Sequence, residues 1–321
     1  MLGLNKAAIQ TRGLCKSYGE VQALKSLDLI VPRHSIFGFL GPNGAGKTTT
    51  MKLLLGLIQP TAGSGSIFGQ DIVRSSVAIR SRIGYLSQQP RFVDDMSARE
   101  TLRFTARFFF SGPQAKVEER VNEMLELVGL QDKADRPVKG FSGGERQRLG
   151  LALAQVNYPE LLILDEPAAA LDPIGRYEVL RVMERLQAHT TIFYSTHILD
   201  DVQQVSDTVA ILNHGELIAQ GPIERLLAGS GSPVYTLTLK ENAIAALDRI
   251  KALPWVSGID VAARNGFVTW QVCVSDEQAA ETDLLRQVLA DESLTVVEFS
   301  RRKYQLEEVF MDVVRGENHG R

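Results

Sequence analysis

Four short apolar runs in the first part of the chain predict strands that are buried on both faces of a sheet. Each run has the length of a strand and is bounded by polar or glycine-containing segments. Segments with helical spacing of apolar residues lie between the runs, and this alternation indicates an open α/β sheet. The predicted strands are Ile36–Leu40, Arg82–Leu86, Leu161–Leu164 and Thr191–Ser195.

Helical spacing dominates two segments between these strands. The region from Ser97 to Ala134 carries apolar residues on two flanks, and we interpret its phenylalanines as core because most apolar stripes face a core. A second helix opens at Phe141 and places apolar residues at i, i+3, i+4 and i+7. The apolar positions are Leu102, Phe104, Ala106, Phe108, Phe109, Met124, Leu125 and Val128 in the first region, and Leu149, Ala152, Leu153 and Val156 in the second.

The segment that ends near Val31 predicts two strands joined by a turn at Ser17–Glu20. Tyr18 on this turn could stack on an adenine ring or simply cap the sheet. From the residue alone we favour the cap, because aromatic side chains often merely pack. Further on, Pro60–Ser66 is rich in glycine and serine, and we interpret it as a hairpin connection with no chemistry of its own.

The pattern changes at a linker, residues 229–233, which separates a first domain, 1–228, from a second. Residues 234–315 follow the order β-α-β-β-α-β and add a final helix at Gln305–Val314, which predicts a small α+β ferredoxin-like domain before a tail at 316–321. We favour dimerisation or packing over regulation as its role. The predicted strands are Val234–Leu239, Val256–Ala262, Phe267–Val274 and Leu294–Phe299, and the helices are Ala243–Leu253 and a segment around Leu284–Leu289.

Composition narrows the choice of function. The chain has 321 residues and a net charge of −3, so bulk electrostatics give no reason to expect nucleic-acid binding. Cys15 and Cys273 lie far apart without metal-ligand spacing, and we expect both to be free and buried in a reducing compartment. No signal peptide is evident and no apolar run has the length of a membrane span, so a membrane process would need another chain to do the spanning.

The clearest chemical signal is a segment that directly follows a predicted strand and fits G-x-x-x-x-G-K-[ST]. Its glycines let successive backbone N–H groups point inward at phosphates, and the helix that starts near Thr48 adds the positive end of its dipole. Lys47 is expected to reach the β- and γ-phosphates, and the Thr48 hydroxyl to coordinate Mg²⁺. This nucleotide-binding loop comprises Gly41, Pro42, Asn43, Gly44, Ala45, Gly46, Lys47, Thr48 and Thr49.

Polar residues follow three further predicted strands. Gln88 comes after one, Asp165 and Glu166 come directly after another, and His197 follows the last. Because ligands of open α/β sheets bind at the carboxyl edge, we expect these residues to join the phosphate loop in one site. There Asp165 can hold Mg²⁺, Glu166 can orient or deprotonate water, and His197 can hydrogen-bond a γ-phosphate or the attacking water.

The segment Ser142–Glu145 at the start of a predicted helix allows two interpretations. Its S-x-x-E spacing predicts a capping box, in which two side chains satisfy backbone groups of the first turn. Gly143 and Gly144 beside the cap also leave helix N–H groups uncovered, which suits a terminal phosphate.

In this order, the motifs resemble those of the nucleotide-binding subunit of an ABC (ATP-binding cassette) transporter over about residues 8 to 225. Two positions depart from the usual pattern: Glu145 stands where many members have Gln, and Ala168–Ala170 precede the D-loop aspartate where Ser or Gly is frequent. Leu306–Phe310 resembles the end of the C-terminal extensions of ABC-2-type exporter ATPases. The matching residues are the phosphate loop Gly41–Thr49, the adenine-stacking Tyr18, the Q-loop Gln88, the signature Ser142–Glu145, Asp165, Glu166, the D-loop Asp172 and the switch His197.

The resemblance implies a P-loop NTPase of the α/β class with a helical subdomain at about 90–156 and an antiparallel N-terminal β-subdomain. It also implies an ATPase that uses ATP and Mg²⁺. Lys47, Gln88, Glu166 and His197 would act in catalysis, and Thr48, Gln88 and Asp165 would hold the metal. The residues implied to bind ATP are Tyr18, the phosphate loop, Ser142, Gly143, Gly144, Glu145 and Asp172.

The resemblance further implies partners and a location. Two cassettes, either two copies of this chain or this chain and a paralogous cassette, would close head to tail around ATP, so that each nucleotide meets one phosphate loop and the other signature. The Q-loop region would pass the movement to a separate multi-span permease at the cytoplasmic face of the cell membrane. The resemblance of the C-terminal segment favours export.

Alternatives of other classes fit less well. Soluble ABC proteins that act on ribosomes usually carry two cassettes, but the loop occurs once here. Those that act on DNA carry a long coiled coil between loop and signature, and this chain has no room for one. A small GTPase would need an N-K-x-D motif, whereas Asn5-Lys6 is followed by two alanines.

Overall fold

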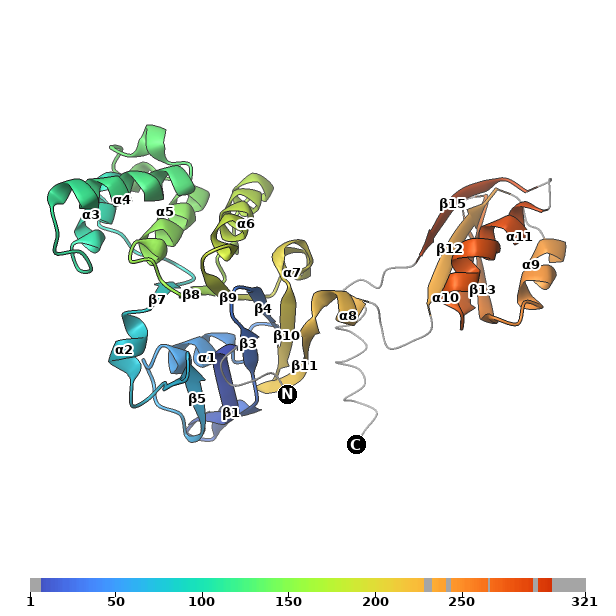
Figure 1. Ribbon diagram of the computed structural model, residues 1–321, viewed down its shortest axis with the longest axis horizontal. Helices are drawn as coiled ribbons and strands as arrows, with labels where there is room; N and C mark the ends of the chain where they lie inside the picture. Colours follow the sequence, from blue (N-terminus) through green and yellow to red (C-terminus); the bar gives the residue numbers. More distant parts are fainter. Residues whose placement is uncertain (1–6, 228–232, 241–243, 265, 291–293, 302–321) are drawn as a thin grey trace. The chain divides into compact units, whose positions relative to one another are not determined.

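The computed structural model describes residues 7–227, 233–240, 244–264, 266–290 and 294–301. By their contacts, these residues form two compact units that are divided after Ile223. Each unit in Figure 1 is described by itself. The predicted final helix, Gln305–Val314, and nearly all of the predicted linker lie outside the described residues.

The first unit is built on a six-stranded sheet with the order β11-β10-β4-β9-β8-β7. The strands from β10 to β7 are parallel, and β11 pairs antiparallel with β10 at the edge. The four strands predicted from apolar runs are confirmed, whereas β10 and β11 were not predicted. Their bounds are β4 Ile36–Leu40, β7 Ile83–Leu86, β8 Leu161–Asp165, β9 Thr191–Thr196, β10 Thr208–Asn213 and β11 Glu216–Pro222.

Helices cover both faces of this sheet, which explains why its central strands are apolar on both sides. Figure 1 shows α6 and α7 on one side and α1 on the other. The buried rings of Phe39 and Phe193, with centroids 5.2 Å apart, join neighbouring strands within the core. The helices are α1 Lys47–Leu54, α2 Ser76–Arg80, α6 Pro173–Gln187, α7 Leu199–Val205 and α8 Ile223–Leu227, of which α8 begins at the division between the units.

An antiparallel β-subdomain is built from the N-terminal strands. The predicted hairpin forms from β1 (Ala7–Tyr18) and β2 (Val21–Leu27), and short strands β3 (Ile30–Pro32) and β6 (Gln70–Asp71) join it. The prediction for Pro60–Ser66 is wrong. Residues Ala62–Ile67 form strand β5, which pairs along β1.

Small residues suit β5 because its backbone lies close to its neighbours. A Cβ atom on Gly63 would come 2.0 Å from the carbonyl oxygen of Gly13, and one on Gly65 would come 2.8 Å from Ile72 Cδ1. Glycine and serine therefore mark close strand packing at this position rather than a turn.

The helical subdomain consists of α3 (Ala98–Ala106), α4 (Gln114–Leu127), the short turns η1 (Gln131–Lys133) and η2 (Val138–Gly140), and α5 (Gly143–Gln155). Leu102 and Ala106 are buried as predicted, but the assignment of the phenylalanines to the core is wrong. Phe104, Phe108 and Phe109 are 58 %, 73 % and 49 % exposed. Helix α3 ends at Ala106, so the helical spacing does not extend to the later phenylalanines.

The second unit follows the predicted order β-α-β-β-α-β. Its four-stranded sheet has the order β13-β14-β12-β15, all antiparallel, which is the arrangement of a ferredoxin-like unit. Alternating residues of β12 and β14, with Trp270 fully buried, face the helices and form a separate core. The elements are β12 Val234–Leu239, α9 Ile244–Lys251, β13 Val256–Arg264, β14 Phe267–Val274, α10 Glu277–Ala279, η3 Ala280–Leu284, α11 Leu285–Leu289 and β15 Val296–Arg301.

The two cysteines are free, as predicted, but both are only half-buried. Cys15 donates to the carbonyl oxygen of Gly13 at 3.3 Å, and Cys273 lies on β14.

Gly84 on β7 provides a test of the packing between the sheet and the helical subdomain. A Cβ atom at this position would lie 1.9 Å from the carbonyl oxygen of Ala154 near the end of α5, too close for any side chain. We expect Gly84→Ala to lower the free energy of unfolding by about 3 kcal/mol, since overpacking forces the backbone to shift. Gly112→Ala is the control because no atom lies within 4 Å of its Cβ position. Equal urea midpoints for the two variants would contradict this prediction.

Candidate functional site

The loop between β4 and α1 is held close to the backbone of neighbouring segments. Gly44 and Gly46 have φ angles of 82° and 108°, which favour glycine. A Cβ atom on Gly41 would lie 2.3 Å from the carbonyl oxygen of Leu212, and one on Gly46 would lie 2.6 Å from that of Ala23. The glycines therefore let this loop curl directly above the sheet edge. There it packs against Ala23 of β2 and Leu212 of β10, a strand that was not predicted from the sequence.

Lys47 is the first residue of α1 and is almost fully buried. Its Nζ atom donates to the carbonyl oxygen of Gly41 at 2.6 Å and to that of Pro42 at 3.2 Å, so the side chain folds back over the loop. The same Nζ atom lies 3.3 Å from Glu166 Oε1. A buried ammonium paired with one carboxylate and two carbonyl groups is in place to bind an anion that enters the loop.

Glu166 lies directly after β8, and its backbone has the unusual φ angle of 48°. Such a conformation is costly for a residue with a side chain and is found mainly at functional sites. The Glu166 N–H donates to Ser195 Oγ at 3.0 Å. Its Oε2 atom lies 2.7 Å from His197 Nδ1, so one carboxylate contacts both Lys47 and His197.

Asp165 and Thr48 form a second polar pair beside this carboxylate. Thr48 Oγ1 donates to Asp165 Oδ2 at 3.0 Å, and Ser195 Oγ donates to Asp165 Oδ1 at 2.6 Å. The hydroxyl and the carboxylate are hard oxygen donors of the kind that Mg²⁺ prefers, so this pair fits the predicted metal. The described residues contain no group of three or more His, Cys, Asp and Glu that could hold a metal by themselves. A Mg²⁺ site of this kind takes its remaining ligands from phosphates and water.

Ser195 is the residue of this cluster that the sequence reasoning missed. It is fully buried, and it contacts both Asp165 and the Glu166 backbone from the neighbouring strand. The register of the parallel strands places Asp165 opposite Ser195. The sequence offered one signal for Ser195: it ends a predicted strand, two residues before His197.

Lys47, Thr48 and Glu166 line one hollow of about 180 Å³, and Gln88 lines it as well. His197 reaches this edge through its contact with Glu166, so residues from four separate predicted motifs meet at one edge of the sheet as predicted. Tyr18 is not among the lining residues and is 49 % exposed, with Lys16 Nζ 5.0 Å from its ring centroid. The lining residues are Ala23, Pro42, Asn43, Gly44, Gly46, Lys47, Thr48, Thr49, Gln88 and Glu166.

The segment Ser142–Glu145 does not line this hollow. It begins α5 with the predicted capping box, in which Ser142 Oγ accepts the Glu145 N–H at 3.2 Å and Glu145 Oε2 accepts the Ser142 N–H at 2.8 Å. Asp172 caps α6 by accepting the N–H of Gly175 at 3.1 Å. A Cβ atom on Gly144 would lie 3.4 Å from the Cα atom of Gly175, so the two helix N-termini lie side by side.

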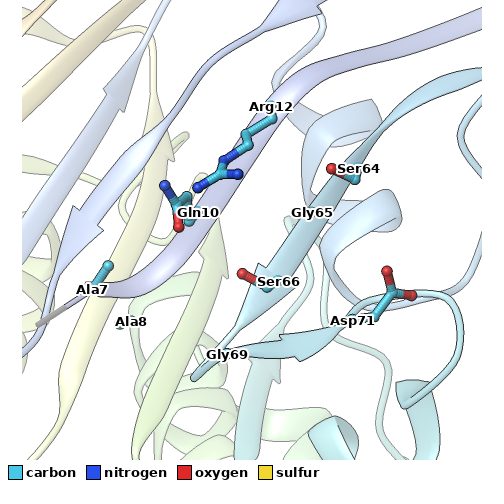
Figure 2. Close-up of a pocket in the computed structure, with 9 residues that line it drawn as sticks. All are labelled: Ala7, Ala8, Gln10, Arg12, Ser64, Gly65, Ser66, Gly69 and Asp71. Carbon is cyan, nitrogen blue, oxygen red and sulfur yellow. The ribbon is translucent and has the colours of Figure 1, made fainter. Parts of the chain in front are cut away.

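A larger hollow, about 310 Å³, lies on the β-subdomain along β1 and β5 (Figure 2). Alanine and glycine line it together with the polar residues Gln10, Arg12, Ser64 and Ser66. Asp71 is already engaged, since its carboxylate accepts the N–H groups of Val73 and Arg74. That engagement lowers the Asp71 pKa, with the Arg74 N–H as the main cause. Nothing in this hollow matches the reactive groups of the smaller one, so size does not identify the site here.

Comparisons with known proteins agree with this geometry. The ABC transporter family profile matches residues 24–169. The uncharacterized ABC transporter ATP-binding protein YxlF of Bacillus subtilis is 38 % identical over 95 % of this chain and 99 % of its own length. This chain belongs to the ATP-binding proteins of ABC transporters. As a cassette of this family it is an ATPase subunit, and the α/β fold with its P-loop is that of the family.

Other relatives of this ATP-binding cassette match different shares of the chain. The bacitracin transport ATP-binding protein BcrA of Bacillus licheniformis is 43 % identical over 68 % of this chain and 71 % of its own length. The daunorubicin resistance ATP-binding protein DrrA3 of Streptomyces coeruleorubidus is 34 % identical over 95 % of both chains. The solved structure of cbiO1 from Clostridium perfringens, part of the ABC transporter complex cbiONQ, has a TM-score of 0.65 and 27 % identity over 70 % of this chain and 92 % of its own.

In the described part of the cassette protein, no helix has both the length and the apolar character needed to cross a membrane.

Proposed function

We propose that this chain is the Mg²⁺-dependent ATPase subunit of an exporter, and that it works as a head-to-tail dimer at the cytoplasmic face of the membrane beside a separate permease. The observation that carries the proposal is the Glu166 carboxylate, which lies between Lys47 and His197 and next to the Asp165–Thr48 pair. This arrangement brings a base, two phosphate-binding groups and metal ligands together at one edge of the sheet. That combination suits attack of water on a γ-phosphate.

Each side chain has a proposed role in that reaction. Glu166 orients the attacking water and accepts its proton. Lys47 leaves Glu166 and binds the β- and γ-phosphates, while His197 holds the γ-phosphate through its ring. Gln88 lines the hollow, where it is proposed to sense the terminal phosphate. Tyr18, exposed at the end of β1, is proposed to stack on the adenine.

Thr48 and Asp165 are the residues proposed to hold Mg²⁺, with Gln88 as a further oxygen ligand. A bound Mg²⁺ supplies positive charge that stabilises the phosphate oxygens during transfer. Ser195 keeps Asp165 in position by donating to its carboxylate, which leaves the other oxygen of Asp165 directed at Thr48.

The second half of the site is proposed to come from another cassette. Ser142, Gly143 and Gly144 lie outside the hollow, yet the N-terminus of α5 exposes N–H groups of the type that bind phosphate. In a head-to-tail dimer, Ser142 and Gly144 would contact the γ-phosphate bound to the partner, and Asp172 would lie at the same interface. Two identical copies are sufficient for this arrangement.

Mixing two inactive variants tests the composite site. Lys47→Ala damages the phosphate loop, and Ser142→Asp adds a negative charge to the signature while Asp still caps the helix well. Each homodimer is expected to be inactive, whereas a heterodimer isolated with two affinity tags retains one intact site and hydrolyses ATP. Heterodimers without activity would argue against assembly in trans, provided that a single site can turn over.

Export and the permease are proposed from two observations. The relatives BcrA and DrrA3 are named for bacitracin transport and daunorubicin resistance, which favours a transport role over action on ribosomes or DNA. In addition, Phe104 and Phe108 form an exposed edge-to-face pair, with centroids 5.2 Å apart, beside exposed Phe109 on the helical subdomain. Exposed aromatic groups of this size mark interaction surfaces, and a cytoplasmic helix of the permease is the proposed occupant.

Co-purification tests the permease assignment. When the chain is expressed with the permease encoded beside its gene, we expect the two to remain together in detergent. Phe108→Ser is expected to reduce the recovered permease by about tenfold, because an aromatic anchor is lost from the interface. Val77→Ser, at a 74 % exposed position outside the helical subdomain, is the matched control. Recovery of a ribosomal or DNA complex in place of a membrane protein would favour the soluble alternative.

We propose the domain limits 1–228 and 234–315, with the second domain as a dimerisation or packing module. The matches to YxlF and DrrA3 extend over 95 % of the chain, which supports a shared role for this domain among those relatives.

A further inference from the structure

Glu145 places a carboxylate in the first turn of the signature helix. Its Oε2 atom accepts the Ser142 N–H at 2.8 Å, which fixes the side chain inside the signature. The side chain of Glu145 is only 10 % exposed. A charged group therefore lies in the same helical turn as the glycine N–H groups that are proposed to meet the partner's ATP.

Lys133 supplies the opposite charge from another element. It ends η1, and its Nζ atom forms an ion pair with Glu145 Oε1. Burial would raise the pKa of Glu145, but the Lys133 ammonium and the Ser142 N–H outweigh burial and hold that pKa below its ordinary value. Glu145 is therefore ionised. Lys133 pairs with its Oε1 atom while Ser142 donates to Oε2. Arg136 adds a smaller electrostatic attraction to the same carboxylate.

The η1 turn that carries Lys133 is itself tied to the helical subdomain. The Lys133 N–H donates to the carbonyl oxygen of Leu130 at 3.1 Å, and the carbonyl oxygen of Ala134 accepts the Arg99 N–H from α3 at 2.9 Å. The backbone of Lys133 is therefore held by the subdomain, and its half-exposed side chain is held at Nζ by Glu145.

An uncompensated carboxylate at this position would work against phosphate binding. The N–H groups of Gly143 and Gly144 and the dipole of α5 attract an anion, whereas the charge of Glu145 repels it. Screening by salt is weak for groups that are shielded from water, so a nearby ammonium is the effective way to cancel this repulsion.

We propose that Lys133 is a positioning residue of the signature: by neutralising Glu145, it allows the helix N-terminus to bind the γ-phosphate of ATP held by a second copy of this chain. Lys133 acts through Glu145 and does not itself touch the nucleotide. This inference rests on the proposed head-to-tail dimer. With a neutral residue at position 145, the helix N-terminus would carry no negative charge that repels phosphate. The Lys133–Glu145 pair is proposed to achieve the same result.

The test measures the ATP concentration that gives half-maximal dimer, in a Glu166→Gln parent that does not turn over. Sedimentation analysis follows Lys133→Met, Glu145→Gln and the combination of both in that parent. We expect Lys133→Met to raise the half-maximal concentration about tenfold, because the repulsion is no longer cancelled. Glu145→Gln removes the carboxylate that Lys133 neutralises, so adding Lys133→Met to it is expected to have no further effect.

A matched control separates this effect from a general change in charge. Lys139 lies in the same subdomain and pairs with Asp95 at 2.8 Å, with both side chains largely exposed. Lys139→Met makes the same change in net charge, and we expect it to leave dimerisation within about twofold of the parent. ATP binding at protein concentrations too low for dimers should be unchanged by Lys133→Met.

Each contrary result has a distinct meaning. If Lys133→Met weakens dimerisation equally with and without Glu145→Gln, Lys133 does not act through Glu145 and the inference is refuted. If Lys133→Met has no effect in a parent that dimerises with ATP, the inference fails while the proposed function stands. If the Glu166→Gln parent stays monomeric with ATP, the head-to-tail dimer itself is refuted, and the inference falls with it.

Discussion

Glu166→Gln is expected to lower the rate of ATP hydrolysis by about 100-fold or more, because loss of a general base commonly costs that much. The substitution keeps the size of the side chain, and the Gln carbonyl oxygen can still accept from the groups that surround it. Nucleotide binding should therefore survive while turnover stops. An ATP-bound dimer is expected to accumulate, visible as a species of twice the mass in size-exclusion chromatography with ATP.

Glu184→Gln on α6 is the control for this substitution. Glu184 pairs with Arg181 at 3.1 Å on the surface, so the same chemical change occurs at a far less buried position than Glu166. We expect wild-type turnover from this variant. Turnover near the wild-type rate in Glu166→Gln would remove Glu166 from the role of base, and Asp165 would then be the remaining carboxylate at the end of β8.

The sequence predicted which polar residues gather at the carboxyl edge of the sheet, because that placement depends on local pattern. A buried parallel strand is recognisable from its apolar run, and the residue that follows such a strand lies at the edge where ligands bind. Gln88, Glu166 and His197 could thus be grouped by their positions after predicted strands. Ser195 escaped because its importance comes from strand register, which places it opposite Asp165 and which apolar spacing alone does not reveal.

The errors arose where tertiary contacts override local preference. Gly63 and Gly65 would ordinarily break a strand, but their missing side chains let β5 approach β1 and Ile72. Phe104 and Phe108 lie in or just after an amphipathic helix, so spacing alone assigned them to its core face. An apolar side chain can be covered by its own chain or by a partner protein. The choice depends on the assembly, so it cannot be read from the sequence of one chain.

For the ferredoxin-like unit, the sequence predicted the fold but not the role. Strict alternation in Phe267–Val274 predicted a strand with one buried face, and the buried residues Trp270 and Val272 lie on that face of β14. The order of elements was therefore predictable, since each strand and helix carries its own period. The role of the unit was not, because no cluster of reactive side chains marks a site within its sequence pattern.

Lys47→Ala is expected to weaken ATP binding by about 100-fold or more. Lys47 is the buried cation of the phosphate loop, and removing one partner of a desolvated charge pair usually costs several kcal/mol. The loop glycines and the start of α1 would still present N–H groups, so weak binding should remain. Isothermal titration with a non-hydrolysable ATP analogue measures the change directly, and thermal unfolding checks that the variant is folded.

Lys52→Ala, on the same helix, separates the loss of this particular ammonium from a general loss of positive charge. Lys52 lies in the last turn of α1 and is exposed, whereas Lys47 begins the helix and contacts Glu166. We expect Lys52→Ala to bind ATP as tightly as the wild type, because an exposed charge more than a helical turn from Lys47 is largely screened. Equal affinities for all three proteins would show that Lys47 serves only to neutralise Glu166. Phosphate binding would then rest on the loop N–H groups alone.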